Sequence, residues 1–384
     1  MDLILFDDSN YPEALCVDGT HAGFYIEEGS GDGKDKFIIF FQGGGACFGP
    51  TKELALTSCY QRSFTDLGSS KHWLKSRYGT GIQQADETLN PHFYNWNKVF
   101  VPYCDGLVHQ GHSDEPYQFL GKKLYFRGLD NSMATFQYLI DNYGLASDSV
   151  KEVLFTGTSA GGIANFYYAD ILKNMLPAET KYWVAADSGF FINYYTDNPN
   201  NFFVQCINSM LNLVDRSKIL PQGCPDIDNE NAFECVSPQY WIQNIESDLY
   251  IIQSAYDQFT LEAFMGIECT SGAGDMQGCS ENKQQTIQDF RKSMLDDINN
   301  IIYNKKNANA WVVSCIHHAF LEANRDFNTN IYEVPEHSGN TPQQALYEWM
   351  YSDKRENMID RQPWPYNQPC NGESSFNYNN FIFQ

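Results

Sequence analysis

The sequence predicts a fold of the α/β class, in which a mostly parallel sheet is flanked by helices. Three observations support this prediction: six short apolar runs look like buried strands, helical stretches separate them, and small or polar residues follow them. Strands that are buried on both faces of a parallel sheet read as nearly continuous apolar runs. Alternation of such runs with helices is typical of the α/β class.

The six strand-like runs are short and nearly all apolar. In chain order they are Lys36–Gln42, Lys98–Tyr103, Glu152–Thr156, Tyr182–Ala186, Leu249–Ser254 and Ala310–Ser314. The helical candidates lie near residues 128–143, 161–176, 200–214, 283–303 and 341–351. Each strand-like run is followed by a Gly, Asp, Ser or His. Because ligands bind at the carboxyl ends of strands in such sheets, we expect these residues to form the rim of an active site.

We interpret residues 1–384 as a single domain, because the chain contains no internal repeat, long linker or low-complexity tract. Length alone would also allow two domains. The segment from about 187 to 248 is rich in Asn, Asp, Pro and aromatic residues, and it contains Cys206, Cys224 and Cys235. We expect it to form an irregular insertion or a lid, which disulfides would hold in place if the chain is oxidised.

The acidic composition excludes several classes of partner. A net charge of −23 repels nucleic-acid backbones and anionic membranes, so nucleic-acid binding is excluded as the main function. The same charge argues against a polyanionic substrate. No apolar run reaches the roughly 20 residues that a transmembrane helix needs, so we expect no transmembrane segment. The oligomeric state stays open.

The eleven cysteines are widely spaced, which favours disulfides over a structural zinc site. An odd number leaves at least one thiol free within a single chain. Cys269 and Cys279 flank a glycine-rich loop, and we predict a bridge between them. The opening segment MDLILFDDSN lacks the features of a signal peptide, and no asparagine begins a glycosylation sequon. The cysteines favour an oxidising compartment and the latter two observations favour the cytoplasm, so the compartment stays open.

The strongest chemical signal is the sequence GTSAG at Gly157–Gly161, which follows a predicted strand and precedes a predicted helix. It matches G-x-S-x-G, the nucleophile elbow of α/β-hydrolases. The elbow needs small residues because the backbone turns sharply there and a Cβ atom would clash. We therefore predict Ser159 as a nucleophile and an α/β-hydrolase-like fold. The alternative is a glycine-rich turn that carries an inert serine.

A serine nucleophile needs an adjacent base, and in α/β-hydrolases the order along the chain is Ser, then Asp or Glu, then His. Asp257 follows a predicted strand in IIQSAYDQF, and His317 and His318 follow the last one in WVVSCIHHAF. We predict that Asp257 orients the base and that one of the two histidines is the base. The alternatives are a loop or helix-capping role for Asp257 and a packing role for a histidine.

The segment QGGGAC at Gln42–Cys47 follows an early predicted strand. Such loops, together with the residue after the nucleophile, supply the backbone N–H groups of an oxyanion hole. We predict Gly44, Gly45 and Ala160 as these donors. A phosphate-binding loop is the alternative, but no Gly-Lys-Ser/Thr follows.

We expect neither a cofactor nor a metal. His109 and His112, with Asp114, lie in a loop without a helix to align them, so a surface position or a substrate contact is more typical than metal binding. Asp187 and Phe190 follow a predicted strand near the elbow. They are candidates for the substrate pocket, with simple packing at the strand exit as the alternative.

With these residues assigned, the chain resembles the pectin acetylesterase/Notum family. The resemblance spans about Cys16 to Cys370 and rests on several segments in one order. They are LCVDGT, QGGGAC, VPYCDG, the FRG before residue 129, TGTSAGG, ADSGFF, AYD and SCIHH. The resemblance implies a triad of Ser159, Asp257 and His318, because the spacing Ser-Cys-x-x-His falls on His318 and leaves His317 as a packing residue.

The chain departs from the family pattern in the oxyanion loop, where the family commonly reads Glu-Gly-Gly-Gly-Trp-Cys and this chain has Gln42 and Ala46. We expect the loss of that Trp to reshape the pocket wall beside Ala46. The resemblance implies ester hydrolysis, with removal of acetyl from pectin in one branch and of a fatty acyl group from a secreted signalling protein in the other. It also implies secretion.

We therefore expect a serine esterase that removes an acetyl or longer acyl group from an acylated glycan or an acylated protein. Ser159 attacks the ester, His318 takes its proton, and Asp257 holds the imidazole tautomer. The alternative is a catalytically silent protein with a structural or binding role, because fold does not imply function. A third interpretation is a carbohydrate-binding module that does not hydrolyse its ligand.

Overall fold

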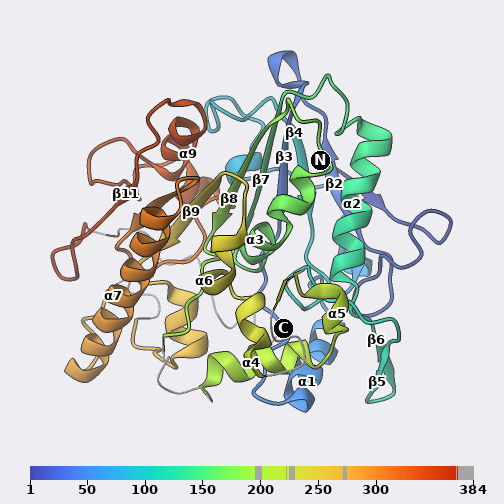
Figure 1. Cartoon of the computed structure of the whole chain (residues 1–384), viewed down its shortest axis with the longest axis horizontal. Helices are drawn as coiled ribbons and strands as arrows, with labels where there is room; N and C mark the ends of the chain where they lie inside the picture. The colour runs from blue at the N-terminus through green and yellow to red at the C-terminus, as the bar shows by residue number, and fades with distance from the viewer. Residues whose placement is uncertain (195–200, 222, 225–229, 271–274, 369, 371–384) are drawn as a thin grey trace.

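The computed structural model describes residues 1–194, 201–221, 223–224, 230–270, 275–368 and 370, and a nine-stranded sheet forms its centre (Figure 1). The sheet runs in the order β1 (Asp2–Leu5), β2 (Gly23–Glu27), β4 (Asn97–Val101), β3 (Lys36–Phe41), β7 (Glu152–Thr158), β8 (Lys181–Asp187), β9 (Leu249–Ser254), β10 (Ala308–Val313) and β11 (Met358–Ile359). Strands β4 to β11 in this order are parallel, whereas β1 and β2 pair antiparallel at one edge.

The prediction of an α/β-hydrolase-like fold with a mostly parallel sheet is confirmed. The six predicted strands correspond to β3, β4, β7, β8, β9 and β10, with ends that differ by at most a few residues. These strands read clearly because both of their faces are buried: in β7, Val153 and Phe155 pack into one core and Leu154 into the other. Strands β1, β2 and β11 were not predicted: β1 and β11 are short strands at the two edges of the sheet, and β1 is half exposed.

Helices cover both faces of the sheet. They are α1 (Lys52–Arg62), α2 (Gly128–Tyr143), α3 (Ala160–Lys173), α4 (Phe202–Leu211), α5 (Arg216–Ile219), α6 (Pro238–Trp241), α7 (Glu281–Asn304), α8 (Asn324–Phe327) and α9 (Pro342–Tyr351). Residues of α2, α3 and α7 join the core on one face, and residues of α9 join the core on the other. The five predicted helices correspond to α2, α3, α4, α7 and α9. Away from the sheet, β5 (Tyr117–Phe119) and β6 (Lys122–Leu124) form a hairpin.

The segment predicted as an insertion contains short helices rather than strands. Between residues 187 and 248, the described part forms α4, α5 and α6, and Cys224 is bonded to Cys235. Residues 195–200, 222 and 225–229 of this segment lie outside the described residues. In Figure 1, α4 and α5 lie together near α1, beyond one end of the central strands. That this segment acts as a lid, and that the chain is a single domain, stay predictions.

Five disulfides connect the chain. They are Cys16–Cys104, Cys47–Cys59, Cys224–Cys235, Cys269–Cys279 and Cys315–Cys370. The predicted bridge between Cys269 and Cys279 is therefore confirmed, and the odd cysteine is Cys206, which is buried with a free thiol. None of the helices in the described ranges is long and apolar enough to cross a bilayer.

Candidate active site

The elbow around Ser159 joins the end of β7 to the start of α3. Ser159 has φ 57° and ψ −116°, a backbone conformation that a residue with a side chain rarely adopts. A Cβ atom on Gly157 would lie 2.6 Å from the carbonyl oxygen of Phe41, and one on Gly161 would lie 2.0 Å from it. The backbone N–H of Ser159 donates to the carbonyl of Asp187 at 2.8 Å. The glycines are therefore required where the elbow presses against β3, and this contact and the hydrogen bond to β8 hold the strained turn in place.

Asp257 and His318 meet because β9 and β10, which precede them, are neighbours in the sheet. His318 Nδ1 donates to Asp257 Oδ2 at 2.6 Å, and both side chains are buried. The other carboxylate oxygen, Oδ1, accepts from the backbone N–H of Thr260 at 2.8 Å and from its hydroxyl at 2.7 Å. Because Nδ1 carries the shared proton, the lone pair of a neutral His318 lies on Nε2, which is the atom that a general base uses.

Two aromatic rings connect His318 with the cavity that Ser159 lines. The rings of Phe259 and Phe191 have centroids 5.5 Å and 6.1 Å from that of His318. Both phenylalanines line the same cavity as Ser159. The predicted base therefore packs directly on the cavity wall. Its neighbour His317 instead stacks on Tyr332 at 4.7 Å in the core, away from the cavity.

Asp187 ties the elbow to the loop that carries His318. Its Oδ2 accepts from the hydroxyl of Thr158 at 2.8 Å and from the backbone N–H groups of Phe320 at 2.8 Å and Leu321 at 2.9 Å. Its Oδ1 accepts from the hydroxyl of Ser188 at 2.9 Å. Burial raises the pKa of Asp187, and these donors oppose that rise. Asp187 thus fixes the position of the elbow relative to the predicted base, and it is fully buried behind the cavity.

The glycine loop after β3 packs on the elbow. A Cβ atom on Gly43 would lie 3.1 Å from the Cβ of Ser159, so the loop and the elbow are in close contact. Gly45 has φ +66° and lines the cavity, as do Ala160 and Ser159. Gly44 is not among the described residues that line the cavity. Two of the three predicted oxyanion donors therefore belong to residues on the cavity wall beside the predicted nucleophile.

The histidines of the 109–114 loop are buried, so the expected surface position is wrong. His109 Nε2 donates to the carbonyl of Gln42 at 2.8 Å, and burial lowers the pKa of His109 to about 4, which keeps it neutral near pH 7. His112 Nδ1 lies 2.7 Å from a carboxylate oxygen of Asp130, and its Nε2 lies 3.1 Å from Asp114. Across the described ranges, no group of three or more His, Cys, Asp or Glu side chains is arranged to hold a metal ion.

Asp105 organises the loop between β4 and β5, and sequence reasoning did not find it. Its carboxylate accepts from the backbone N–H groups of Leu107 at 3.2 Å, His109 at 3.0 Å and Gly111 at 3.2 Å. Burial raises the pKa of Asp105 to about 6, against the effect of these donors. The signal was present in the strand-ending sequence VPYCDG, where an Asp-Gly pair is typical of a turn that its own side chain closes. We call residues 105–111 the rim loop.

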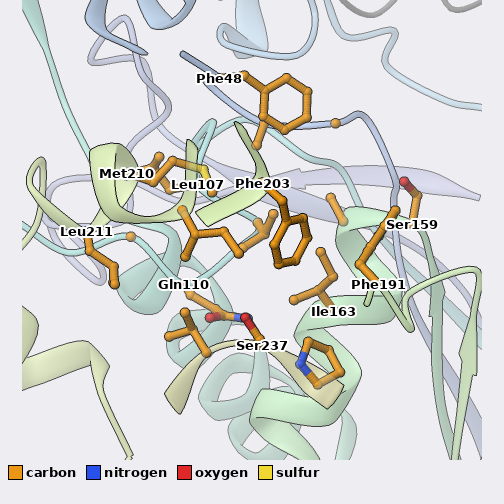
Figure 2. Close-up of a pocket in the computed structure, with 18 of the residues that line it drawn as sticks. Phe48, Leu107, Gln110, Ser159, Ile163, Phe191, Phe203, Met210, Leu211 and Ser237 are labelled. Carbon is orange, nitrogen blue, oxygen red and sulfur yellow. The ribbon is translucent and has the colours of Figure 1, made fainter. Parts of the chain in front are cut away.

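A largely apolar cavity opens beside Ser159 (Figure 2). Its empty space is about 790 Å³, a value that includes the part open to solvent. The described residues that line it are all uncharged. They are Gly45, Ala46, Phe48, Leu107, Val108, Gln110, Gly111, Ser159, Ala160, Ile163, Phe191, Phe203, Ile207, Met210, Leu211, Val214, Ile219, Val236, Ser237, Pro238, Phe259 and Phe264.

Of the residues predicted for the pocket, Ala46 lies on the cavity wall, whereas Asp187 and Phe190 lie behind it. Phe190 packs in the core, with its ring 6.4 Å from that of Phe166, and the next residue, Phe191, faces the cavity instead. The strand exit that the sequence predicts for the pocket therefore contributes Phe191, rather than Phe190, to the cavity wall. It gave no indication that α4 supplies a large part of the wall.

The chain is similar to known proteins in both sequence and fold. The family model described as Pectinacetylesterase matches residues 1–371. Pectin acetylesterase 5 of Arabidopsis thaliana is 27% identical, over 93% of this chain and 82% of the relative. Palmitoleoyl-protein carboxylesterase notum2 of Xenopus laevis is 28% identical, over 73% of this chain and 57% of the relative. The solved structure of the Wnt deacylase Notum from Drosophila has the same fold, with a TM-score of 0.76 and 22% identity, over 95% of this chain and 98% of that one.

Proposed function

This chain belongs to the pectinacetylesterase family and is a carboxylic ester hydrolase, and we propose that it removes a medium or long acyl chain by way of an acyl-enzyme on Ser159. The observation that carries the proposal is the uncharged and largely apolar lining of the cavity beside Ser159. An acetyl group has a single methyl beyond its carbonyl and would contact only a small part of this apolar lining. A longer acyl chain would bury apolar surface there, at about 25 cal/mol per Å².

In the proposed mechanism, Ser159 Oγ attacks the ester carbonyl while His318 Nε2 takes the hydroxyl proton. The hydrogen bond of 2.6 Å from His318 Nδ1 to Asp257 supports this assignment, because it fixes the tautomer and stabilises the imidazolium that forms. His318 then gives the proton to the leaving alcohol oxygen, which leaves with it. Water repeats the sequence on the acyl-enzyme, releasing the carboxylic acid and the free serine.

The negative charge that develops on the carbonyl oxygen needs backbone donors. We assign the N–H groups of Gly45 and Ala160, which belong to residues on the cavity wall beside Ser159, and that of Gly44 in the same loop. Removal of one such donor costs about 3–4 kcal/mol of transition-state stabilisation in comparable sites. Glycine suits this loop because Gly45 has a left-handed backbone, with φ +66°.

The names of the relatives point to two kinds of ester, which differ in the acyl group and in its acceptor. The name of pectin acetylesterase 5 indicates an acetyl ester of pectin, whereas that of palmitoleoyl-protein carboxylesterase notum2 indicates a fatty acyl ester of a protein. The cavity supports the second kind of acyl group for this chain. The net charge of the chain, −23, also disfavours a polyanion such as pectin as the acceptor. We therefore favour a fatty-acylated protein or an acylated neutral glycan as the substrate.

The experiment that tests the proposal measures kcat/KM on p-nitrophenyl esters from acetate to palmitate. We expect kcat/KM to rise with chain length beyond acetate, and Ser159→Ala to lower kcat by about 10⁶-fold, the loss seen when a serine nucleophile is removed from a comparable triad. The melting temperature of Ser159→Ala should match that of the wild type, which shows that the variant is folded. A maximum at acetate would instead support an acetylesterase, and turnover by folded Ser159→Ala would refute the nucleophile.

A further inference from the structure

Gln110 is a buried amide in the apolar cavity wall, and nothing in the proposed chemistry uses it. Its side chain is 3% exposed. Within the described ranges, its Nε2 atom is buried and donates to no acceptor. The other polar side chains of the wall are Ser159, the proposed nucleophile, and Ser237, whose hydroxyl donates to the carbonyl of Phe233 at 2.7 Å.

A buried amide without a partner is costly. Leaving a buried donor unpaired costs about 1–3 kcal/mol, and an apolar side chain of the same size would avoid this cost. Most buried polar groups in native proteins have a partner, so an exception at a ligand cavity points to a ligand. The two ends of a carboxamide differ little in shape, and rotation about its last bond can turn either the donor or the acceptor towards the cavity.

The rim loop holds Gln110 in place. The carboxylate of Asp105 accepts hydrogen bonds from the backbone N–H groups of His109 and Gly111, the residues on either side of Gln110. The backbone N–H of Gln110 itself donates to the carbonyl of Leu107 at 3.0 Å. A loop fixed in this way presents its side chain with little freedom, as a selective contact requires.

Gln110 is far from the reacting ester. Figure 2 shows Ser159 and Gln110 in different parts of the cavity, well apart in the view, with Ile163 and Phe203 drawn between them. The amide is therefore not an oxyanion donor. Its partner must lie further along the acyl chain than the carbonyl that Ser159 attacks.

We propose that Gln110 is a specificity-determining residue that selects acyl chains carrying a hydroxyl group away from the ester carbonyl. The inference rests on the proposed function, because it needs an acyl chain in the cavity. A hydroxyl oxygen on the acyl chain would accept from Gln110 Nε2. Ser237 lies in the same part of the cavity (Figure 2), and because its own proton is donated to the carbonyl of Phe233, its hydroxyl oxygen is free to accept the proton of that hydroxyl group. An unsubstituted chain offers the amide no acceptor, and it therefore binds less well than a chain with a hydroxyl group at that point.

The test compares p-nitrophenyl decanoate with its positional monohydroxy isomers on the wild type and on Gln110→Met, a substitution of similar length. We expect one group of isomers with a distal hydroxyl to exceed the unsubstituted ester in kcat/KM by roughly 3- to 10-fold, the value of one hydrogen bond. Gln110→Met should abolish or reverse this ratio. Gln118→Met, at an exposed position on β5, should keep the wild-type ratio.

The melting temperature of the ligand-free protein gives a second, independent reading. An unpaired buried amide predicts that Gln110→Met melts at or above the wild-type temperature, whereas an amide that holds the fold together predicts a clear decrease. A hydroxyl preference that is equal in the wild type and Gln110→Met, or absent from both, overturns the inference. Either result leaves the proposed function standing so long as the unsubstituted ester is hydrolysed and Ser159→Ala does not hydrolyse it.

Discussion

The predicted catalytic residues and the cavity wall are built from opposite kinds of contact. Asp257 and His318 are joined by a hydrogen bond of 2.6 Å. The carboxylate of Asp187 accepts hydrogen bonds from Thr158 at the end of β7 and from Phe320 in the loop after β10. The wall opposite is apolar, and α4 contributes Phe203, Ile207 and other residues to it. Directional bonds fix a single geometry, whereas apolar packing tolerates changes of shape. Substitutions among the polar groups should therefore affect every substrate, and substitutions in the wall should change the choice among substrates.

The largest effect is expected at Asp257. Asp257→Asn keeps the size of the side chain but no longer fixes the His318 tautomer, so kcat should fall by about 10⁴-fold, as in a comparable triad. The loss should be the same for acetate and for long-chain p-nitrophenyl esters, because the wall is unchanged. Asp289→Asn, at an exposed position on α7, serves as the matched control and should behave as the wild type. A decrease of less than tenfold would remove Asp257 from the triad.

A smaller and selective effect is expected in the wall. Ile207 is half-buried on α4 and lines the cavity, so Ile207→Trp should fill part of the space for the acyl chain. We expect kcat/KM for the palmitate ester to fall by at least about 10-fold, the cost of poor fit in an apolar pocket, with little change for acetate. Phe202→Trp places the same side chain on the exposed side of α4 and should change neither value. Equal losses for the two esters would contradict a separate acyl cavity.

The smallest effect is expected in the rim loop and concerns stability. The pKa of His109 is lowered from 6.5 to about 4, so the unfolded chain binds more protons between these values and stability rises with pH. The pKa of Asp105 is raised from 3.8 to about 6, so the folded protein binds more protons there and stability falls as pH rises. The two contributions oppose each other between about pH 4 and 6 in the wild type.

Asp105→Asn removes one of these opposing contributions. The melting temperature of the variant relative to the wild type should therefore increase from pH 4 to pH 6, even though the lost carboxylate hydrogen bonds lower it at every pH. Thermal melts of both proteins across this range measure the difference. A difference that does not change with pH would show that Asp105 titrates in the folded protein as it does in the unfolded chain.

The different contacts of the two regions also explain how much of each the sequence predicts. Ser159, Asp257 and His318 stand at the ends of β7, β9 and β10, and buried parallel strands are readily recognised from their apolar runs. The strained elbow has its own signature, because Gly157 and Gly161 have no room for a side chain beside β3. Local chain signals therefore predicted the sheet and the positions where these three residues lie.

The cavity wall has no such signature. Gln110 in the rim loop and Ile207 on α4 line the same cavity. They are distant in the sequence, and nothing in their spacing indicates that they share a cavity. Helix α1 was also not predicted. Its buried apolar residues are Ala55, Leu56 and Cys59, and these few residues stand in a mostly polar segment. Contacts between segments that are distant in sequence decide the shape of the pocket, and one sequence does not reveal them.

Reaction with fluorophosphonate probes of short and long alkyl chains, followed by peptide mapping, tests the central claim most directly. We expect a single covalent adduct on Ser159, with the long-chain probe reacting faster because its chain enters the apolar cavity. Folded protein that forms no adduct on Ser159, or that forms one with no dependence on chain length, would contradict the pairing of a serine nucleophile with an acyl-binding cavity.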